Sequence, residues 1–130
     1  MPKYSDRSKI KLETCDSKLQ DLFNEVIKHF DCSILCGHRG EEEQNKVYHT
    51  GWSKLQFPRS KHNSSPSKAV DAAPYPIDWK DRERFYYFAG VVKGVALGMN
   101  ISIRWGGDWD SDTQVKDQTF FDLPHFEVNE

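Results

Sequence analysis

One histidine and one aspartate bracket a short polar loop in the middle of the sequence. His62 lies in the tripeptide SKH, Asp71 ends the tripeptide AVD, and small polar residues fill most of the gap between them. An imidazole and a carboxylate can bind the same metal ion if the loop between them folds back on itself. A hydrolytic zinc site also needs a third protein ligand and a carboxylate that can take a proton from water.

The segment DLPHFEV near the end of the sequence offers both missing groups. His125 lies between an extended Leu-Pro pair and an alternating Phe-Glu-Val run, which is typical of a strand. Asp122 precedes this histidine by three residues, and Pro124 stiffens the chain between them. We therefore expect His62, Asp71 and His125 to be metal ligands and Asp122 to be the general base.

These motifs together resemble a known family of enzymes. The tripeptides SKH and AVD, the later DLPH and the turn Gly37-His38-Arg39 are similar to motifs of the D-Ala-D-Ala carboxypeptidase and dipeptidase zinc peptidases. The aspartate at position 122, where many members have glutamate, is similar to phage endolysins that are L-alanyl-D-glutamate endopeptidases. The sequence departs from the pattern in one place, because its histidine-to-aspartate loop is two residues longer than the commonest form.

The resemblance implies a fold, a cofactor and a set of roles. The fold would be the small sheet of the hedgehog and DD-peptidase-like zinc peptidases, with one zinc ion on the three ligands named above. Asp122 would exchange a proton with water and the leaving amine. Arg39 would stabilise the oxyanion or bind a substrate carboxylate, and Ser60 would orient a ligand or the substrate. The substrate would be the stem peptide of bacterial peptidoglycan, cut between L-Ala and D-Glu.

Two other functions fit the same residues. One is a D-Ala-D-Ala carboxypeptidase or dipeptidase, and the other is a non-catalytic cell-wall-binding module of the same fold. A binding module would lack the base, so Asp122 favours an enzyme. Each residue also has a purely structural alternative: a solvated loop histidine for His62, a strand-ending residue for Asp71, and an exposed charge at a helix start for Arg39.

An acidic loop stands apart from these motifs. Asp108, Asp110 and Asp112 occupy alternate positions in GGDWDSDTQ, as at the start of a calcium-binding loop. The central glycine is missing, and Thr119 stands where an EF-hand would have its closing glutamate. An EF-hand is therefore excluded. A looser regulatory site for Ca²⁺ is one expectation for this loop, and a solvated acidic loop is the simpler one.

The hydrophobic pattern predicts an α+β domain with a small, mostly antiparallel sheet. Helices are expected over residues 16–30, 41–51 and 78–99. Strands are expected at CSILC, around residues 70–72, at ISIRW and within TFFDLPHFEV.

Two further features concern how these elements pack. Residues 52–76 contain few periodic apolar positions and four prolines, so we expect a long irregular segment that serves function. In the last helix, Gly90, Gly94 and Gly98 recur every four residues. We expect this row of glycines to let the helix pack closely on the sheet.

Length and composition limit the remaining possibilities. A chain of 130 residues with 37% hydrophobic residues fits a single folded domain over residues 1–130. A net charge of −2 provides no strong overall field for nucleic acid or anionic membranes. The three cysteines are too few and too uneven for a disulfide framework. We expect a monomer with peptidoglycan as its partner.

The expected location follows from the absence of two sequence patterns. No segment approaches the roughly 20 apolar residues of a membrane span, so no membrane insertion is expected. The first residues also lack the apolar core of a signal peptide. We therefore expect the protein to reside in the host bacterial cytoplasm and to reach the cell wall after a separate membrane-lesion protein opens the way.

Overall fold

The structure is a computed structural model that describes residues 2–116 and 118–130. This part of the chain forms four α-helices and one four-stranded sheet of order β1-β2-β4-β3, in which every pairing is antiparallel. The α+β prediction is confirmed. The elements are α1 (Asp6–Glu13), α2 (Ser17–Val26), β1 (Cys32–Cys36), α3 (Glu41–His49), the 3₁₀ turn η1 (Lys61–Asn63), β2 (Ala69–Pro74), α4 (Arg82–Gly98), β3 (Ile103–Gly106) and β4 (Asp122–Val128).

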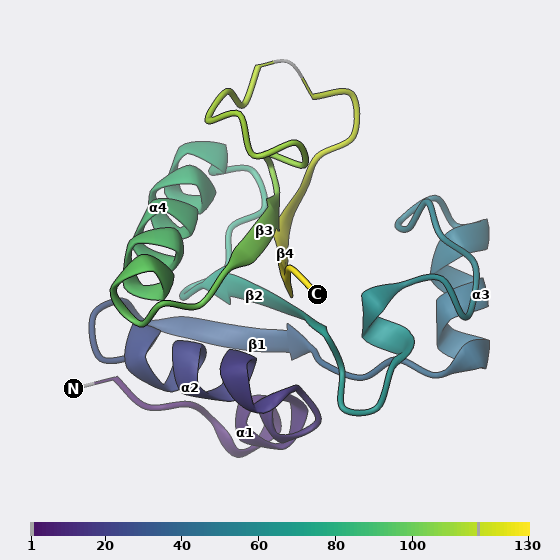
Figure 1. Ribbon diagram of the computed structural model, residues 1–130, viewed down its shortest axis with the longest axis horizontal. Helices are drawn as coiled ribbons and strands as arrows, with labels where there is room; N and C mark the ends of the chain where they lie inside the picture. The colour runs from purple at the N-terminus through teal and green to yellow at the C-terminus, as the bar shows by residue number, and fades with distance from the viewer. Residues whose placement is uncertain (1, 117) are drawn as a thin grey trace.

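The sheet has one apolar face and one polar face. Figure 1 shows α1, α2 and α4 gathered against the sheet, while α3 stands apart from them. Alternate strand residues such as Val70 and Phe126 join α2 and α4 in the buried core. Because side chains alternate along a strand, the residues between them point to the other face. Asp71 and His125 therefore emerge on the side away from the helices.

Strand pairing brings the aspartate of one motif opposite the histidine of another. In the β2–β4 ladder, Asp71 lies directly across from His125. In the β3–β4 ladder the register shifts, because Trp105 pairs with Phe126 while the next residue of β3 pairs with Asp122. This irregularity in β4 lets Asp122 reach the same site as His125, which strict alternation over three residues would prevent.

Glycine is required where β3 meets the irregular part of β4. A side chain at Gly106 would collide with the backbone of Asp122. The expectation for the last helix is wrong, because Gly90, Gly94 and Gly98 are exposed and nothing lies within 4 Å of where their Cβ atoms would be. The core side of α4 is formed instead by its large apolar residues and alanines: Phe85, Phe88, Ala89, Val92 and Ala96.

Several element boundaries differ from the predictions. Helix α2 ends at Val26 rather than at residue 30, and turns follow it. Helix α4 begins at Arg82 because Asp81 caps it, accepting a hydrogen bond from the third residue of the helix. Helix α1 was not predicted, since only Ser8 and Leu12 of its eight residues are buried. In the described part of the chain, no helix is both long and apolar enough to cross a membrane.

The exposed glycines of α4 give a test of this packing. Replacing Gly94 with alanine is expected to raise the free energy of unfolding by about 0.5–1 kcal/mol, because alanine loses less backbone entropy in a helix and meets open space here. Chemical denaturation measures the change. Gly106→Ala serves as the matched comparison and is expected to destabilise the protein. A loss of stability in Gly94→Ala would mean that α4 packs by its glycine face after all.

Candidate metal centre

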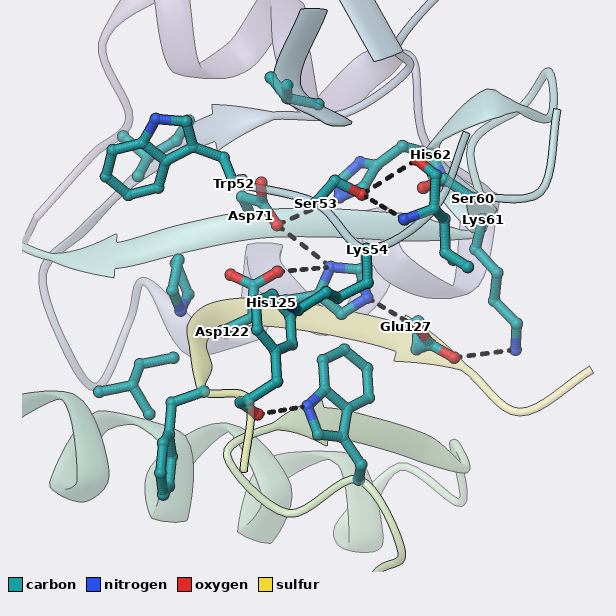
Figure 2. Close-up of a pocket in the computed structure, with 18 of the residues that line it drawn as sticks. Trp52, Ser53, Lys54, Ser60, Lys61, His62, Asp71, Asp122, His125 and Glu127 are labelled. Atoms are coloured by element: carbon teal, nitrogen blue, oxygen red, sulfur yellow. Dashed lines mark hydrogen bonds and ion pairs between the residues drawn. The ribbon is translucent and has the colours of Figure 1, made fainter. Parts of the chain in front are cut away.

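Three segments of the chain meet on the polar face of the sheet. His62 comes from η1, Asp71 from β2, and Asp122 and His125 from β4. Figure 2 shows their side chains converging, with the Asp71 carboxylate between the two imidazoles. Oδ1 of Asp71 lies 3.1 Å from Nε2 of His62 and 3.3 Å from Nδ1 of His125. Oδ2 of Asp122 lies 3.8 Å from the same Nδ1. The residues that the motifs singled out are thus neighbours in space.

The His62 ring is fixed on its outer side by the backbone of Gly37, the residue that follows β1. Its Nδ1 lies 2.7 Å from the carbonyl oxygen of Gly37, so this nitrogen donates a proton and Nε2 faces the centre. A Cβ at Gly37 would collide with the carbonyl of Lys11 in α1 and with Thr14 just after that helix. Gly37, whose carbonyl accepts the bond from His62, is therefore packed tightly against α1. The unpredicted helix α1 therefore helps to position a candidate ligand.

Ser60 positions the backbone of the same histidine. Its hydroxyl accepts a hydrogen bond from the His62 amide at 3.2 Å and caps η1. The Ser60 amide in turn donates a hydrogen bond to Oδ1 of Asn63. The Arg39 amide donates to the His62 carbonyl at 2.8 Å. The expectation that Ser60 orients a ligand agrees with these contacts, and the ligand role itself stays a prediction.

The His125 ring is fixed by a residue that the motif analysis missed. Nε2 of His125 lies 2.7 Å from Oε1 of Glu127, which is buried. Glu127 is in turn held by Arg104 at 2.8 Å and Lys61 at 3.2 Å. The other ring nitrogen, Nδ1, consequently faces Asp71. A glutamate two residues after a histidine in a strand lies on the same face of the sheet as the histidine. This spacing is the signal by which the sequence could have identified Glu127.

Arg39 lies in the wall behind Asp71. Its guanidinium approaches Oδ2 of Asp71 at 3.4 Å and donates to the Gln44 side chain at 3.0 Å. Gln44 is fully buried and also bonds Asn63 and the loop after α3. The arginine thus lines the cleft as expected and is tied to a candidate metal ligand at the same time.

The close charges shift the proton affinities of the whole cluster. Burial works against charge on His62, yet the nearby Asp71 carboxylate raises the pKa of His62 to about 10. Burial also works against charge on His125, but its hydrogen bonds to Asp71 and Glu127 raise the pKa of this ring as well. The pKa of Asp71 falls well below its usual range, because the two rings outweigh its burial. Burial and then the charge of Asp71 raise the pKa of Asp122 to about 6.

The donor atoms fit a divalent metal ion. Nitrogen or oxygen atoms of His62, Asp71 and His125 all lie within 4.8 Å of one another. Both imidazoles have their outer nitrogen engaged by an acceptor, which leaves the lone pair of the inner nitrogen directed at the centre. The cluster is therefore a possible metal-binding site.

The acidic loop is organised by its own backbone. Carboxylate oxygens of Asp108, Asp110 and Asp112 lie within 4.8 Å of one another. The buried Asp108, however, accepts bonds from the amides of Asp112 and Thr113 at 3.2 and 2.9 Å. These bonds account for the shape of the loop without an ion, so the expectation of Ca²⁺ is not supported.

The cluster lies in a cleft large enough for a peptide. The cleft has a volume of about 1070 Å³ and runs between the loop after α3, the start of α4 and the segment before β4. Trp109 and Phe120, stacked with ring centroids 6.3 Å apart, form part of its wall. Two histidines, two aspartates and an open cleft are the features of a candidate metal-dependent peptidase.

Comparison with known proteins identifies the family. A sequence model of the family described as phage L-alanyl-D-glutamate peptidase matches residues 1–129. The chain belongs to this family, and it is an L-alanyl-D-glutamate peptidase of the phage endolysin type. The carboxypeptidase, dipeptidase and binding-module alternatives have no such support. No curated protein matches the sequence significantly.

A solved structure supports the fold. The crystal structure of the Serratia marcescens L-Ala D-Glu endopeptidase ChiX matches with a TM-score of 0.75 and 23% sequence identity. The match covers 97% of this chain and 90% of that chain. At this identity the likeness shows a shared fold.

The charge cluster predicts a pH-dependent stability in metal-free protein. With a chelator present, Asp71→Asn is expected to cost about 3–5 kcal/mol of unfolding free energy near pH 6, because it leaves two buried imidazolium rings without their shared partner. The raised pKa of His62 stabilises the fold fully below its ordinary value of 6.5, and this contribution disappears as pH rises toward about 10. The lowered pKa of Asp71 stabilises the fold at pH values above 3.8, the ordinary pKa of an aspartate.

Denaturation of both proteins between pH 5 and pH 10 measures this difference, with the pH values chosen from those pKa shifts. The difference in unfolding free energy between wild type and Asp71→Asn should become smaller as pH rises. A gap that stays constant up to pH 10 would show that Asp71 does not hold a proton on His62.

Proposed function

We propose that this peptidase cuts the L-Ala–D-Glu bond in the stem peptide of bacterial peptidoglycan with the help of one zinc ion. The observation that supports this most strongly is the convergence of two histidines and one aspartate beside a second, separate carboxylate. His62 through Nε2, Asp71 through Oδ1 and His125 through Nδ1 would hold the ion. Zinc in such a set acts as a Lewis acid and lowers the pKa of water to about 7.

Asp122 is the residue that moves the proton. In the metal-free cluster its pKa of about 6 already leaves the carboxylate mostly ionised at neutral pH, and a nearby divalent cation would favour the ionised form further. It can therefore accept a proton from the attacking water. The water oxygen forms a bond to the alanyl carbonyl carbon, and the carbon–nitrogen bond then breaks. Asp122 returns the proton to the departing nitrogen of D-Glu. The products are an alanyl carboxylic acid and a glutamyl amine, which at neutral pH become a carboxylate and an ammonium group as the second water proton passes from the acid to the amine.

Arg39 acts on charge rather than on protons. Its guanidinium lines the cleft beside Asp71, and its side chain is only 12% exposed. A fixed, poorly solvated cation in this position stabilises negative charge that develops on the scissile carbonyl oxygen. Its bonds to Gln44 and Asp71 hold it in place, so little reorganisation is needed during the reaction.

The biological setting follows from the family. A phage endolysin acts on the cell wall, and we propose that this chain is a monomer that stays in the host cytoplasm until a separate membrane-lesion protein releases it. Mass spectrometry of fragments from purified Gram-negative peptidoglycan, with and without chelator, tests the activity. New alanyl carboxyl and glutamyl amino ends that disappear with chelator would support the proposal. Release of free D-alanine would indicate a carboxypeptidase instead.

Asp122→Asn separates proton transfer from metal binding. The amide keeps the shape of the side chain but cannot accept the proton, so kcat is expected to fall by about 10²–10⁴-fold. The zinc content of the variant should stay at the wild-type value, because Asp122 is not among the three donors. Full activity in a zinc-loaded Asp122→Asn protein would rule out its role as the base.

Glu127→Gln tests how strongly the support of His125 matters. The neutral amide accepts a weaker hydrogen bond from the ring and makes the ligand less basic, so zinc affinity is expected to fall about 10- to 100-fold. Competition with a fluorescent chelator measures the affinity. Glu130→Gln is the control, because Glu130 pairs with Lys18 and Lys68 outside the cleft. Equal affinities in the two variants would mean that Glu127 does not support the ligand.

A further inference from the structure

The walls of the cleft carry an excess of basic groups, although the chain as a whole has a net charge of −2. Three carboxylates line the cleft, at Asp71, Asp122 and Glu127. The basic side chains are Arg39, Lys54, Arg59, Lys61, Arg82 and Arg104. A divalent ion at the candidate centre would add to this excess. The cleft is therefore suited to a substrate that is itself negatively charged.

Three of these cations are already paired inside the protein. Arg39 approaches Asp71 at 3.4 Å. Lys61 and Arg104 share Glu127, at 3.2 and 2.8 Å. Lys61 and Arg104 neutralise Glu127, and Arg39 is held beside Asp71 at the candidate metal centre. These three cations therefore serve the catalytic centre itself.

The other three cations have no carboxylate partner within ion-pair distance among residues 2–116 and 118–130: Lys54, Arg59 and Arg82. Two of them lie over aromatic rings. Nζ of Lys54 is 5.3 Å from the centroid of the Phe120 ring. The guanidinium carbon of Arg82 is 4.9 Å from the centroid of the Phe121 ring. Arg82 also donates one hydrogen bond, from Nη2 to the Tyr86 hydroxyl at 3.1 Å. Cation–π contact of this kind holds a cation in place while leaving its other hydrogen-bond donors available.

Phe120 and Phe121 immediately precede Asp122 in the chain. Lys54 reaches them from the loop after α3, and Arg82 from the first residue of α4. Both residues also line the same cleft as Asp122. Two unpaired cations from separate parts of the fold are thus placed next to the segment that carries the general base.

The substrate brings a negative charge to this region. The proposed reaction requires the scissile nitrogen to lie within hydrogen-bond reach of Asp122. That nitrogen belongs to the glutamyl residue, which has two carboxyl groups while the peptide continues through only one. The other carboxylate is separated from the nitrogen by a few covalent bonds, so it must lie close to Asp122. Without a compensating cation, Asp122 and Asp71 would repel it.

We propose that Lys54 and Arg82 bind the free carboxylate of the leaving glutamyl fragment, and that they make the enzyme selective for stem peptides in which this group is not amidated. The proposal rests on the proposed function, because Asp122 sets where the scissile nitrogen lies. Lys54 and Arg82 would be specificity-determining residues that contact the substrate, and neither takes part in proton transfer.

Two synthetic peptides with the same sequence around the L-Ala–D-Glu bond test the proposal. One has the unlinked glutamyl carboxyl free, and the other has it as a primary amide. The proteins are zinc-loaded wild type, the double variant Lys54→Gln/Arg82→Gln, and the charge-keeping double variant Lys54→Arg/Arg82→Lys. Lys46→Gln, which removes a cation from the exposed side of α3 outside the cleft, is the control for net charge.

Wild type is expected to cleave the acid peptide with a kcat/KM about 10- to 100-fold above that of the amide, the range of a charge-assisted hydrogen bond. The Gln double variant should lose this preference by slowing on the acid peptide alone. The charge-keeping variant and Lys46→Gln should retain it. Unchanged cleavage of the amide peptide by the Gln variant would show that its fold and catalytic centre are intact.

The proposal is overturned if wild type cleaves both peptides equally, or if the Gln double variant keeps the wild-type preference. Equal slowing of the Gln variant on both peptides would also overturn it, because the loss would then not depend on the substrate carboxylate. Failure of zinc-loaded wild type to cleave either peptide is a different result. It would contradict the proposed function, and the assignment of Lys54 and Arg82 with it.

Discussion

The site depends on one carboxylate, that of Asp71, held between two imidazoles. Strand pairing places Asp71 directly opposite His125. His62, in η1, contacts Oδ1 of the same aspartate. Opposite residues in an antiparallel pair have Cβ atoms only about 4.5–5.5 Å apart, so the geometry is set by the sheet rather than by flexible loops. Because the three groups come from separate segments, the cluster forms only when the sheet forms.

This arrangement concentrates charge that must be balanced. Without a metal, protons on His62 and His125 balance Asp71, and the pKa values of both rings are raised. A divalent ion would replace these protons, so metal binding and proton release are linked. The neighbouring Asp122 feels the same negative charge, and its pKa is raised to about 6. One cluster of like and unlike charges thus contains both the candidate ligand set and the proposed base.

The sequence predicted which residues meet at the candidate site better than it predicted the elements around them. SKH, AVD and DLPH identify groups whose chemistry is carried by residue type and spacing, and the structure brings these groups together. Helix α1 was missed because it is short and buries little, although it fixes the Gly37 carbonyl that orients His62. Glu127 was also missed, yet its place two residues after His125 puts it on the same face of a strand.

Other features could not be predicted from residue pattern alone. The row of glycines in α4 suggested close packing, but a four-residue period does not say which side of a helix faces the core. The phenylalanines and alanines on the opposite side decide that. The approach of Lys54 and Arg82 to the segment before Asp122 depends on how two distant parts of the chain fold together. Such contacts between distant residues leave no local signal.

We propose that His62, Asp71 and His125 form one zinc site. X-ray absorption at the zinc edge, measured on purified protein loaded with one equivalent of metal, tests it most directly. We expect two imidazole nitrogens and carboxylate oxygen at about 2.0–2.2 Å from the zinc ion, with loss of one imidazole in either His62→Ala or His125→Ala. A spectrum of oxygen ligands alone, unchanged in both variants, would place the ion elsewhere and rule out His62 and His125 as its ligands.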